Sequence, residues 1–462
     1  MADKHPQIEF SAQQTEEFDR AFELLGGLID LSAANEMYPK RANAVYTACV
    51  VLWMLIYQRL KPDASLEVAV KHLLNTRPDY LPKNKRLTEG TLSESTSGYS
   101  QARSDLPLEV VEWFAGEVCQ AIVAESEPLL NDRNIFLLDG TTIALAPEKE
   151  LQLAFPPASN QFGEGVWPIA LLTVFHELAS GCALLPEIGA MYGPNAASET
   201  ELARDGMAKL PANSIVMTDA GFGIFGVAYE SGRYGHDFLL RMKKSNFISL
   251  RKKATLIAET RNSKTYSLTW TPPTAKNRKT QPELPSNASI DVALHEVTVS
   301  DQLTLYLVTS LKHDANTLAE LFKHRVQVEV DIRNLKVVLD TENIRAKSVE
   351  MFKKELYTSV VAYNLVSQLR RQAAAIINVE PRRMSFKGTW TTLQIFLLRH
   401  MHTDPVKWRE AFRTTLHYAT KDKLPNRPGR KAKREAYRKR PKDAQFEKRQ
   451  KPPSKINTND LK

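Results

Sequence analysis

The most informative stretch of this chain is LFKHRVQVEVDIRNLKVVL, residues 321–339. It has no glycine or proline and contains many helix-forming residues, so we expect a single helix. At about 100° per residue, Arg325, Glu329 and Lys336 fall within roughly 40° of one another. Most of the apolar residues point elsewhere, and a charged strip on an otherwise buried helix is costly unless its charges are paired or functional. A carboxylate between two cations therefore suggests a site that holds a metal ion and grips phosphate.

The composition indicates a protein of several domains in a reducing compartment. The length of 462 residues suggests about two to four domains. The three cysteines, Cys49, Cys119 and Cys182, are far apart and form no C-x-x-C pair, so we expect neither a zinc site nor a disulfide framework. The N-terminus lacks the apolar core of a signal peptide, and the longest apolar run, residues 42–57, is too short to span a bilayer. We therefore expect a cytoplasmic protein without a membrane segment.

The net charge of +9 is concentrated at the C-terminal end. Residues 421–462 hold sixteen Lys and Arg against five Asp and Glu, whereas the rest of the chain holds 46 against 48. A concentrated positive segment favours a polyanion as partner. Residues 425–442 contain five arginines and four lysines, and their proline and glycine residues keep the segment extended, which favours nucleic acid. The alternative is a solvated tail that serves only solubility.

The order of helical and strand-like patterns divides the chain into six parts. Helical periodicity dominates at first, and from residue 134 short apolar runs alternate with helices, which indicates an α/β sheet. Strand-like alternation then dominates a stretch that we interpret as a mostly antiparallel β insertion. The expected parts are an N-terminal helical domain that binds DNA or serves as a scaffold (1–130), the first part of the core (131–235), the β insertion (236–310), the second part of the core (311–380), a C-terminal helical region (381–420) and a basic, disordered tail (421–462).

Individual elements follow from the same patterns. Expected helices cover residues 15–31, 43–60, 66–74, 107–125, 198–209 and 348–376, and a polar loop covers residues 84–97. Expected strands cover residues 134–138, 167–175, 181–185 and 214–218 in the core, and residues 237–242, 265–270, 289–299 and 303–311 in the insertion.

Three acidic residues are candidates for a metal site. Asp139 and Asp219 each directly follow a short apolar strand, and sites in open α/β sheets form at the carboxyl ends of strands. If the two strands are neighbours, a helix packing across that edge would bring Glu329 to the same point. Three carboxylates on rigid elements suit Mg²⁺ or Mn²⁺, and two such ions about 4 Å apart support an in-line phosphoryl displacement. Arg325 and Lys336 would then hold neighbouring phosphates.

Each of these acids also has a purely structural interpretation. An Asp-Gly pair such as the one at Asp139 is a common hairpin turn, and Asp219 before Ala-Gly is compatible with a strand-to-helix turn. Glu329 has Arg325 and Arg333 four residues to either side, which is compatible with an ordinary helix ion pair.

The charged strip is also part of a spaced motif, Phe322-x2-Arg325-x3-Glu329-x6-Lys336. This motif resembles the Y-(2)-R-(3)-E-(6)-K signature of DDE insertion-sequence transposases of the IS-four type. Further stretches resemble that family in the same chain order, so the resemblance covers about residues 40–445. They are YSQAR (99–103), LLDGTT (137–142), TDAGFG (218–223), ELYTSVVAYNL (355–365), RPGR (427–430) and RKRPK (438–442).

The resemblance implies an α/β fold with a ribonuclease-H-like catalytic core interrupted by an all-β insertion. It implies that Asp139, Asp219 and Glu329 form a catalytic triad that binds Mg²⁺ or Mn²⁺, with two ions in the site. The implied reaction is cut-and-paste DNA transposition through strand nicking, a hairpin intermediate and strand transfer. The implied partners are the inverted-repeat ends of the transposon and a target DNA, both double-stranded, in a bacterial cytoplasm in association with the nucleoid. Because paired-end chemistry needs two ends held together, we expect a homodimer on DNA.

The resemblance also gives roles to residues around the triad. It implies that Arg325 and Lys336 contact phosphates of the transposon end. The signature has a tyrosine where this chain has Phe322, so the ring can pack but a hydroxyl donor to phosphate is lost. Trp270 lies in the insertion, where this family can place an aromatic ring on a flipped base; the alternative is a packed strand tryptophan. Asp331 is a rival acid that faces about 160° away from Glu329, so we expect it to be solvated or paired.

Two other functions fit the same sequence features. One is a DNA-binding protein derived from a transposase that has lost its chemistry, and the other is a metal-dependent nuclease that acts without strand transfer. The three intact acids favour retained chemistry, and the cations around Glu329 favour end binding and thus a transposase.

Overall fold

The computed structural model describes residues 32–425, except residues 42, 62–63, 77–83, 131, 161–162, 274–283, 286, 339–343 and 401–404. The chain divides into two compact units, Met1–Lys423 and Leu424–Lys462, and all elements below belong to the first. The helix expected over residues 15–31 and most of the basic tail lie outside the described residues.

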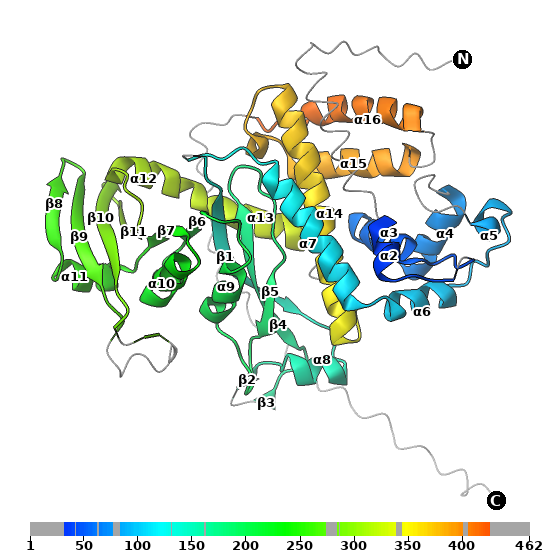
Figure 1. The fold of residues 1–462 in the computed structure, drawn as a ribbon, viewed down its shortest axis with the longest axis horizontal. Coiled ribbons are helices and arrows are strands. Elements are labelled where there is room, and N and C mark those ends of the chain that lie inside the picture. Colours follow the sequence, from blue (N-terminus) through cyan, green and yellow to red (C-terminus); the bar gives the residue numbers. More distant parts are fainter. Residues whose placement is uncertain are drawn as a thin grey trace, which may run out of the picture. The chain divides into compact units, whose positions relative to one another are not determined.

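A nine-stranded sheet runs through the first unit (Figure 1). Its strand order is β5-β4-β1-β6-β7-β11-β10-β9-β8, so the structure is mixed α/β, as expected. β1 pairs in parallel with β6, and β6 with β7, while the other neighbours are antiparallel. The strands are β1 (Ile135–Ala144), β4 (Ile169–Glu177), β5 (Glu187–Ala190), β6 (Ile215–Thr218), β7 (Asp237–Arg241), β8 (Thr255–Glu259), β9 (Ser263–Trp270), β10 (Ile290–Ser300) and β11 (Leu303–Thr309), and β2 (Ser159–Asn160) pairs separately with β3 (Gly163–Glu164).

The first half of β1 is a continuous apolar run because helices cover both faces of the sheet there. Phe136 packs in one buried cluster with residues of α7 (Leu108–Ala124) and α14 (Val349–Ile376). Leu137 packs in a second cluster with residues of α12 (Ala315–Lys323). Since side chains alternate across a strand, a strand buried on both faces needs apolar residues at every position.

The described part of the chain before β1 is helical, as the sequence predicts. All residues of α3 except Arg59 are buried, because α14 and other helices surround it. The short α5 lies within the expected loop 84–97. These helices are α2 (Ser32–Met37), α3 (Ala48–Leu60), α4 (Leu66–Thr76), α5 (Lys85–Thr88), α6 (Ser97–Asp105) and α7.

The helix expected over residues 348–376 is confirmed as α14, which the hydroxyl of Ser348 caps through the N–H of Met351. α3, α7, α15 (Phe386–His400) and α16 (Pro405–Thr420) pack against it, which buries most of its length (Figure 1). Helices also fill the segments between the core strands. They are α8 (Lys149–Ala154), α9 (Glu199–Met207), α10 (Phe225–Arg233) and α11 (Lys244–Arg251).

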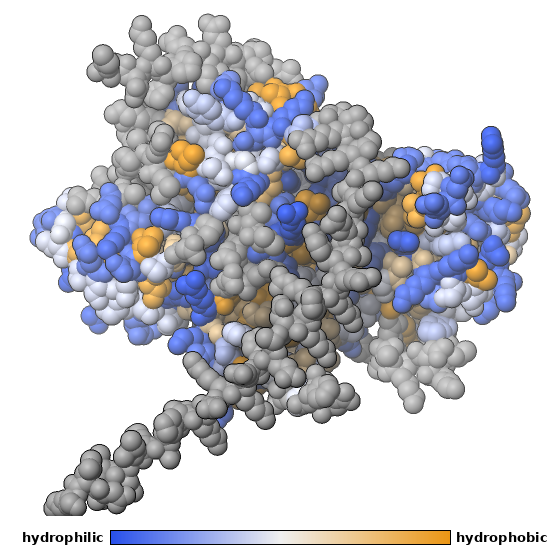
Figure 2. Space-filling view, turned by 180° about the vertical axis from the view of Figure 1, so that it is seen from behind, coloured by the Kyte–Doolittle hydropathy of each residue, from blue (hydrophilic) through white to orange (hydrophobic). Residues whose placement is uncertain are grey.

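The surface of the described residues is mostly hydrophilic. Figure 2 shows apolar side chains only in small separate patches on one face, and exposed large apolar residues come from many different elements. None of the described helices combines the length and the apolar character that a membrane span requires.

Residues 321–338 are helical, but the expectation of one regular helix that is buried outside its charged strip is wrong. After α12 come a 3₁₀ turn (His324–Val326), α13 (Gln327–Arg333) and a π-helical segment (Asn334–Val338). A 3₁₀ helix rotates by about 120° per residue and an α-helix by about 100°. Three residues in the 3₁₀ conformation therefore rotate the positions of the following side chains by about 60° around the helix axis. Val326 and Val330 are accordingly 58% and 53% exposed instead of buried.

Two further expectations are corrected. The segment 236–310 is not all β, because α11 lies within it, and its strands extend the core sheet through the pairing of β11 with β7. Residues 181–185 form no strand; Ala183 makes an isolated bridge to His176, and the next strand is β5. The other expected core and insertion strands are present, with ends shifted by a few residues.

Candidate active site

Asp139 lies in the middle of β1 rather than after its end. The parallel pairing of β1 with β6 stops where Leu137 lies opposite Met217, whereas its pairing with β4 continues to Ala144. Asp139 therefore lies just beyond the point where β1 and β6 stop pairing. Its Oδ1 accepts a hydrogen bond from the N–H of Gly140 at 2.9 Å. The hairpin-turn interpretation of this Asp-Gly pair is wrong, because both residues pair with β4 inside a long strand.

Asp219 directly follows β6, as the sequence predicts. Its Oδ1 accepts a hydrogen bond from the N–H of Gly221 at 2.8 Å in the turn that leads to α10. The strand-to-helix turn is thus real, but it does not exclude a functional role, because β1 and β6 are neighbours and both aspartates lie near the same edge.

The guanidinium of Arg325 lies among all three candidate acids. Its Nη2 is 2.9 Å from Oδ2 of Asp139 and 3.6 Å from Oδ2 of Asp219. Its Nη1 is 3.4 Å from Oε1 of Glu329, one helical turn further along the chain. The Arg325 side chain is only 13% exposed, and α13 packs against β1. The helix therefore brings both an acid and a cation to the two strand aspartates.

One arginine cannot neutralise these carboxylates. Burial raises the pKa of Asp139, the charge of Arg325 and the Gly140 hydrogen bond lower it, and the charges of Asp219 and Glu329 raise it further, with a net rise. By formal charge the three carboxylates of the site outnumber the one guanidinium, so this position favours a further cation.

A fourth carboxylate, Glu199, lies beside Asp139 and was missed by the sequence reasoning. It is the first residue of α9, and a Cβ atom added to Gly140 would collide with its side chain, so glycine permits this close approach. Burial raises the pKa of Glu199, and the charges of Asp139 and Asp219 raise it further. Its sequence context gives no signal of function, because an acidic residue in the first turn of a helix is common.

In the chain, Phe322 precedes Arg325 and Glu329, and Lys336 follows them. Nζ of Lys336 donates to the carbonyl oxygen of Thr142 at 3.0 Å, beyond Asp139 on β1. Lys336 lies in the π-helical segment, a kind of irregularity that is frequent at functional sites. Phe322 is 6% exposed and packs in the same buried cluster as Leu137.

Trp270 is packed at the end of β9. Its ring is 6% exposed and makes an edge-to-face contact with Phe225, at a centroid distance of 5.5 Å. This packing favours the structural interpretation, and base stacking, which stays a prediction, would require the ring to leave its present contacts.

The opposite face of α13 carries a buried ion pair. Asp331 is fully buried, and its Oδ1 and Oδ2 lie 2.8 and 2.7 Å from Nη1 of Arg382. Nε of Arg382 also donates to the carbonyl oxygen of Leu178 at 2.8 Å. Burial by itself would lower the pKa of Arg382, but Asp331 and other neighbours raise it above its usual value. Of the two expectations for Asp331, the paired state is the one observed.

The chemistry of the acidic group fits a divalent cation. In the described part of the chain, no group of three His, Cys, Asp or Glu residues has the arrangement of a metal site, and the carboxylates surround Arg325 instead. Oxygen atoms from three carboxylates lie within 3.6 Å of this one cationic group. Carboxylate oxygens are the ligands that Mg²⁺ and Mn²⁺ prefer, so Asp139, Asp219 and Glu329 are suitable donors.

A sheet that carries convergent carboxylates of this kind is typical of enzymes that act on phosphodiesters with metal ions. A family model described as transposase DDE domain matches residues 131–365, just over half of the chain. The chain therefore belongs to the transposase DDE domain family, and is thus a phosphoryl-transfer enzyme that binds DNA. A comparison with curated proteins finds no match. The matched region contains all three acids, Arg325 and Lys336.

Proposed function

We propose that this protein is the transposase of an insertion sequence of the IS-four type, and that it moves the element by a cut-and-paste route. The steps are strand nicking at the element's ends, a hairpin intermediate and strand transfer to a target. The observation that carries the proposal is the convergence of Asp139, Asp219 and Glu329 on one cationic position inside the family-matched region. The parallel neighbours β1, β6 and β7 support a ribonuclease-H-like core.

In this proposal Asp139, Asp219 and Glu329 hold two Mg²⁺ or Mn²⁺ ions. When bound, such ions activate the attacking oxygen and stabilise the leaving oxygen of an in-line displacement. The chain supplies the carboxylates from rigid elements, two from strands and one from a helix, so they are positioned before DNA arrives. The three carboxylates outnumber the one guanidinium of Arg325, and this excess of formal negative charge favours the binding of cations here.

Arg325 and Lys336 bind phosphates of the transposon end in this proposal. The two cations lie on the same helical run as Glu329, and both reach β1, through Asp139 and Thr142 respectively. With the carboxylates bound to metal ions, the Arg325 guanidinium would be available to contact phosphate, since its planar fork suits either partner. Phe322 contributes packing beneath this helix rather than a phosphate contact.

The substrates are double-stranded DNA ends with inverted repeats and a target duplex. A homodimer assembled on DNA is part of the proposal, because two ends must be held together before strand transfer. In this arrangement the cations beside the triad make sequence-independent phosphate contacts that set the position of the scissile bond.

Nicking of a supercoiled plasmid that carries the element's matched inverted ends tests the proposal. Wild-type protein should nick the plasmid with Mg²⁺ or Mn²⁺ and then join ends to a target. Binding without cleavage would identify a DNA-binding protein that has lost its chemistry. Cleavage without strand transfer would identify a nuclease.

Replacing Glu329 by Gln should lower the nicking rate by more than about a hundredfold, because loss of a ligand exceeds the effect of disturbing residues around a metal site. End binding should stay nearly intact. Glu320→Gln is the matched control, because Glu320 lies on α12 with 71% exposure and pairs with Lys323. Cleavage retained in Glu329→Gln would remove this residue from the triad.

A further inference from the structure

A second concentration of positive charge lies where the N-terminal helices meet α14. A cavity of about 600 Å³, open to solvent, is lined by residues of α3, α6, the start of α4 and the segment that leads into α14. Five cations line it against two carboxylates. They are Arg59, Arg103, Arg345, Lys347 and Lys354, and the carboxylates belong to Glu350 and Glu355.

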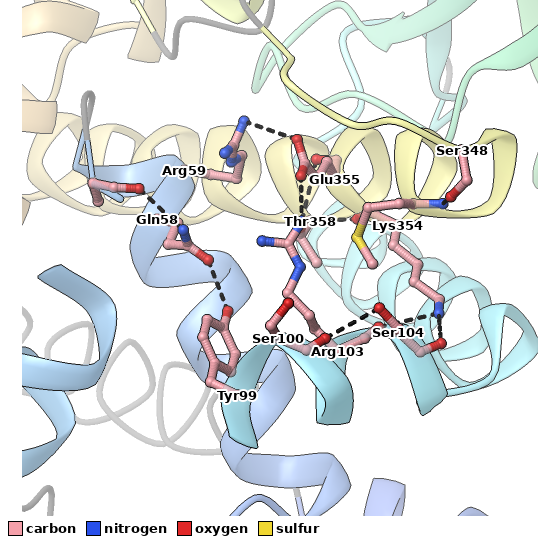
Figure 3. A network of polar contacts seen from close by, with 12 residues as sticks. Gln58, Arg59, Tyr99, Ser100, Arg103, Ser104, Ser348, Lys354, Glu355 and Thr358 are labelled. Atoms are coloured by element: carbon pink, nitrogen blue, oxygen red, sulfur yellow. Dashed lines mark hydrogen bonds and ion pairs between the residues drawn. The ribbon is translucent and has the colours of Figure 1, made fainter. Parts of the chain in front are cut away.

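Both carboxylates of this cavity already have cationic partners. Glu355, whose side chain is 5% exposed, lies 2.5 Å from Nη2 of Arg103 and 3.8 Å from Nη1 of Arg59, between the two guanidinium groups (Figure 3). Oε1 of Glu350 lies 2.7 Å from Nζ of Lys354. A third carboxylate, that of Glu148 outside the cavity lining, lies 3.5 Å from Nζ of Lys347. Three carboxylates against five cations leave a formal charge of +2, so a group that entered the cavity would meet positive charge that is compensated only in part.

Lys354 holds the wall of the cavity in place. Its side chain is 1% exposed, and Nζ donates to the carbonyl oxygens of Arg103 and Ser104 at 3.2 and 3.0 Å (Figure 3). These carbonyl groups lie in the last turn of α6, so Lys354 ties the end of α6 to α14. Because Glu355 holds Arg103 at the same time, the arrangement exists before a ligand binds, which lowers the entropic cost of binding.

Helix starts and hydroxyl groups add hydrogen-bond donors to the cavity. Ser65 and Ser348 line it, and their hydroxyls cap the N-terminal ends of α4 and α14. These ends carry partial positive charge. Ser100 also lines the cavity, and a hydroxyl of this kind can donate to phosphate oxygens, whereas the hydroxyl of Ser104 already donates to the carbonyl oxygen of Ser100 at 3.1 Å.

Arg345 is the one lining arginine that the described part of the protein leaves available. It is exposed, and within the described residues its side chain forms no hydrogen bond or ion pair. Gln58, an amide of the kind that reads base edges, is fully engaged instead, because it binds Ala64 and Tyr99. The cavity thus offers charge and hydroxyls, which recognise phosphate, but no free amide to recognise a base.

We propose that this cavity binds a phosphate of the DNA backbone, independently of base sequence and separately from the acidic group around Arg325. The proposal rests on the proposed function, because it takes DNA as the substrate. The cavity would add a phosphate contact at the junction between the N-terminal helices and α14. Arg345, at the opening of the cavity, would bind this phosphate.

The test is the salt dependence of duplex binding, measured by fluorescence anisotropy over a KCl series. Arg345→Gln should weaken binding several-fold for every duplex sequence and reduce the slope of log K against log salt by about 0.9. Arg261→Gln is the matched control, because Arg261 is exposed between β8 and β9 and, among the described residues, has no hydrogen bond or ion pair. Neither substitution removes an interaction that supports the fold.

Equal slopes for Arg345→Gln and Arg261→Gln would overturn the proposal. Inorganic phosphate provides a second arm: if it raises the melting temperature of the wild type but not of Arg345→Gln, while the DNA slopes are equal, the cavity binds a small anion and not DNA. Nicking by the wild type is scored in parallel. Absent nicking counts against the proposed function, whereas normal nicking with equal slopes counts against this cavity alone.

Discussion

At the scale of single residues, Arg325 decides the electrostatics of the acidic group. It contacts Asp139, Asp219 and Glu329, and its charge opposes the rise in the pKa of Asp139 that burial and the other acids cause. A folded-state pKa above the unfolded value means that an aspartate stabilises the fold at low pH. This stability is lost as pH rises from the unfolded value through the folded one.

Arg325→Gln should therefore destabilise the protein more at neutral pH than at pH 4. Without the guanidinium the pKa of Asp139 rises further, so more stability is lost as the carboxyl ionises above its ordinary value of about 4. The melting temperature of wild type and variant at pH 4 and pH 7 measures this difference. Arg333→Gln, on the exposed part of the same helix, is the control. A pH-independent loss in Arg325→Gln would contradict the assigned role.

The residues of the candidate site differ in how far the sequence predicts them. Asp219 and Glu329 were placed correctly, because an apolar strand and a spaced charged strip define their positions. Asp139 was expected directly after its strand, but it lies within β1. The strand was expected to end there because the Asp-Gly pair is a common turn signal. Glu199 could not be found, because only the folded chain brings the first turn of α9 against a glycine sixty residues earlier.

At the scale of elements, α13 has two functional faces. One face presents Glu329 to the aspartates, and the other holds Asp331 against Arg382. Arg382 in turn binds the carbonyl oxygen of Leu178, just after β4. The buried ion pair thus anchors α13 to the sheet and fixes the face that carries the acid.

Asp331→Asn should lower the free energy of unfolding by about 3–5 kcal/mol, because removing one partner leaves a buried charge uncompensated. Urea denaturation measures the loss. Glu329→Gln, two residues earlier on the exposed face, should change it by less than about 1 kcal/mol, since exposed ion pairs contribute little. Equal losses in the two variants would show that the two faces of α13 do not differ in this way.

Most elements with a clear apolar pattern were predicted, although the apolar run at residues 181–185 forms no strand, and β8 was not predicted. All five residues of β8 are exposed, so no alternation marks it as a strand. The 3₁₀ turn before α13 shifted the phase of its side chains, which no helical wheel drawn over residues 321–339 reproduces. Long elements such as α14 were predicted almost to the residue because their caps are visible in the sequence.

At the scale of the whole molecule, most of the positive charge at the C-terminal end lies beyond the first compact unit. The N–H of Ser385 donates to the carbonyl oxygen of Asp422, and Met384 bridges to Lys423, so a truncation should begin after these residues. The first compact unit ends at Lys423.

Deleting residues 426–462 should weaken DNA binding and flatten its salt dependence by about 0.9 in slope for each phosphate that the shortened chain no longer binds. The melting temperature of the remaining chain should stay close to that of the full-length protein. Anisotropy titrations over a salt series and a thermal melt provide the two readouts. An unchanged slope would mean that the segment serves only solubility.

The sheet has a mechanical consequence for the segment 236–310. Because β11 pairs with β7 and β7 with β6, one ladder of backbone hydrogen bonds joins the outer strands to the strands that carry Asp139 and Asp219. The outer strands are therefore part of one continuous sheet and do not form a separate domain joined by a hinge. We therefore expect that a partner bound at the far edge of the sheet, at β8, changes the orientation of Asp139 and Asp219.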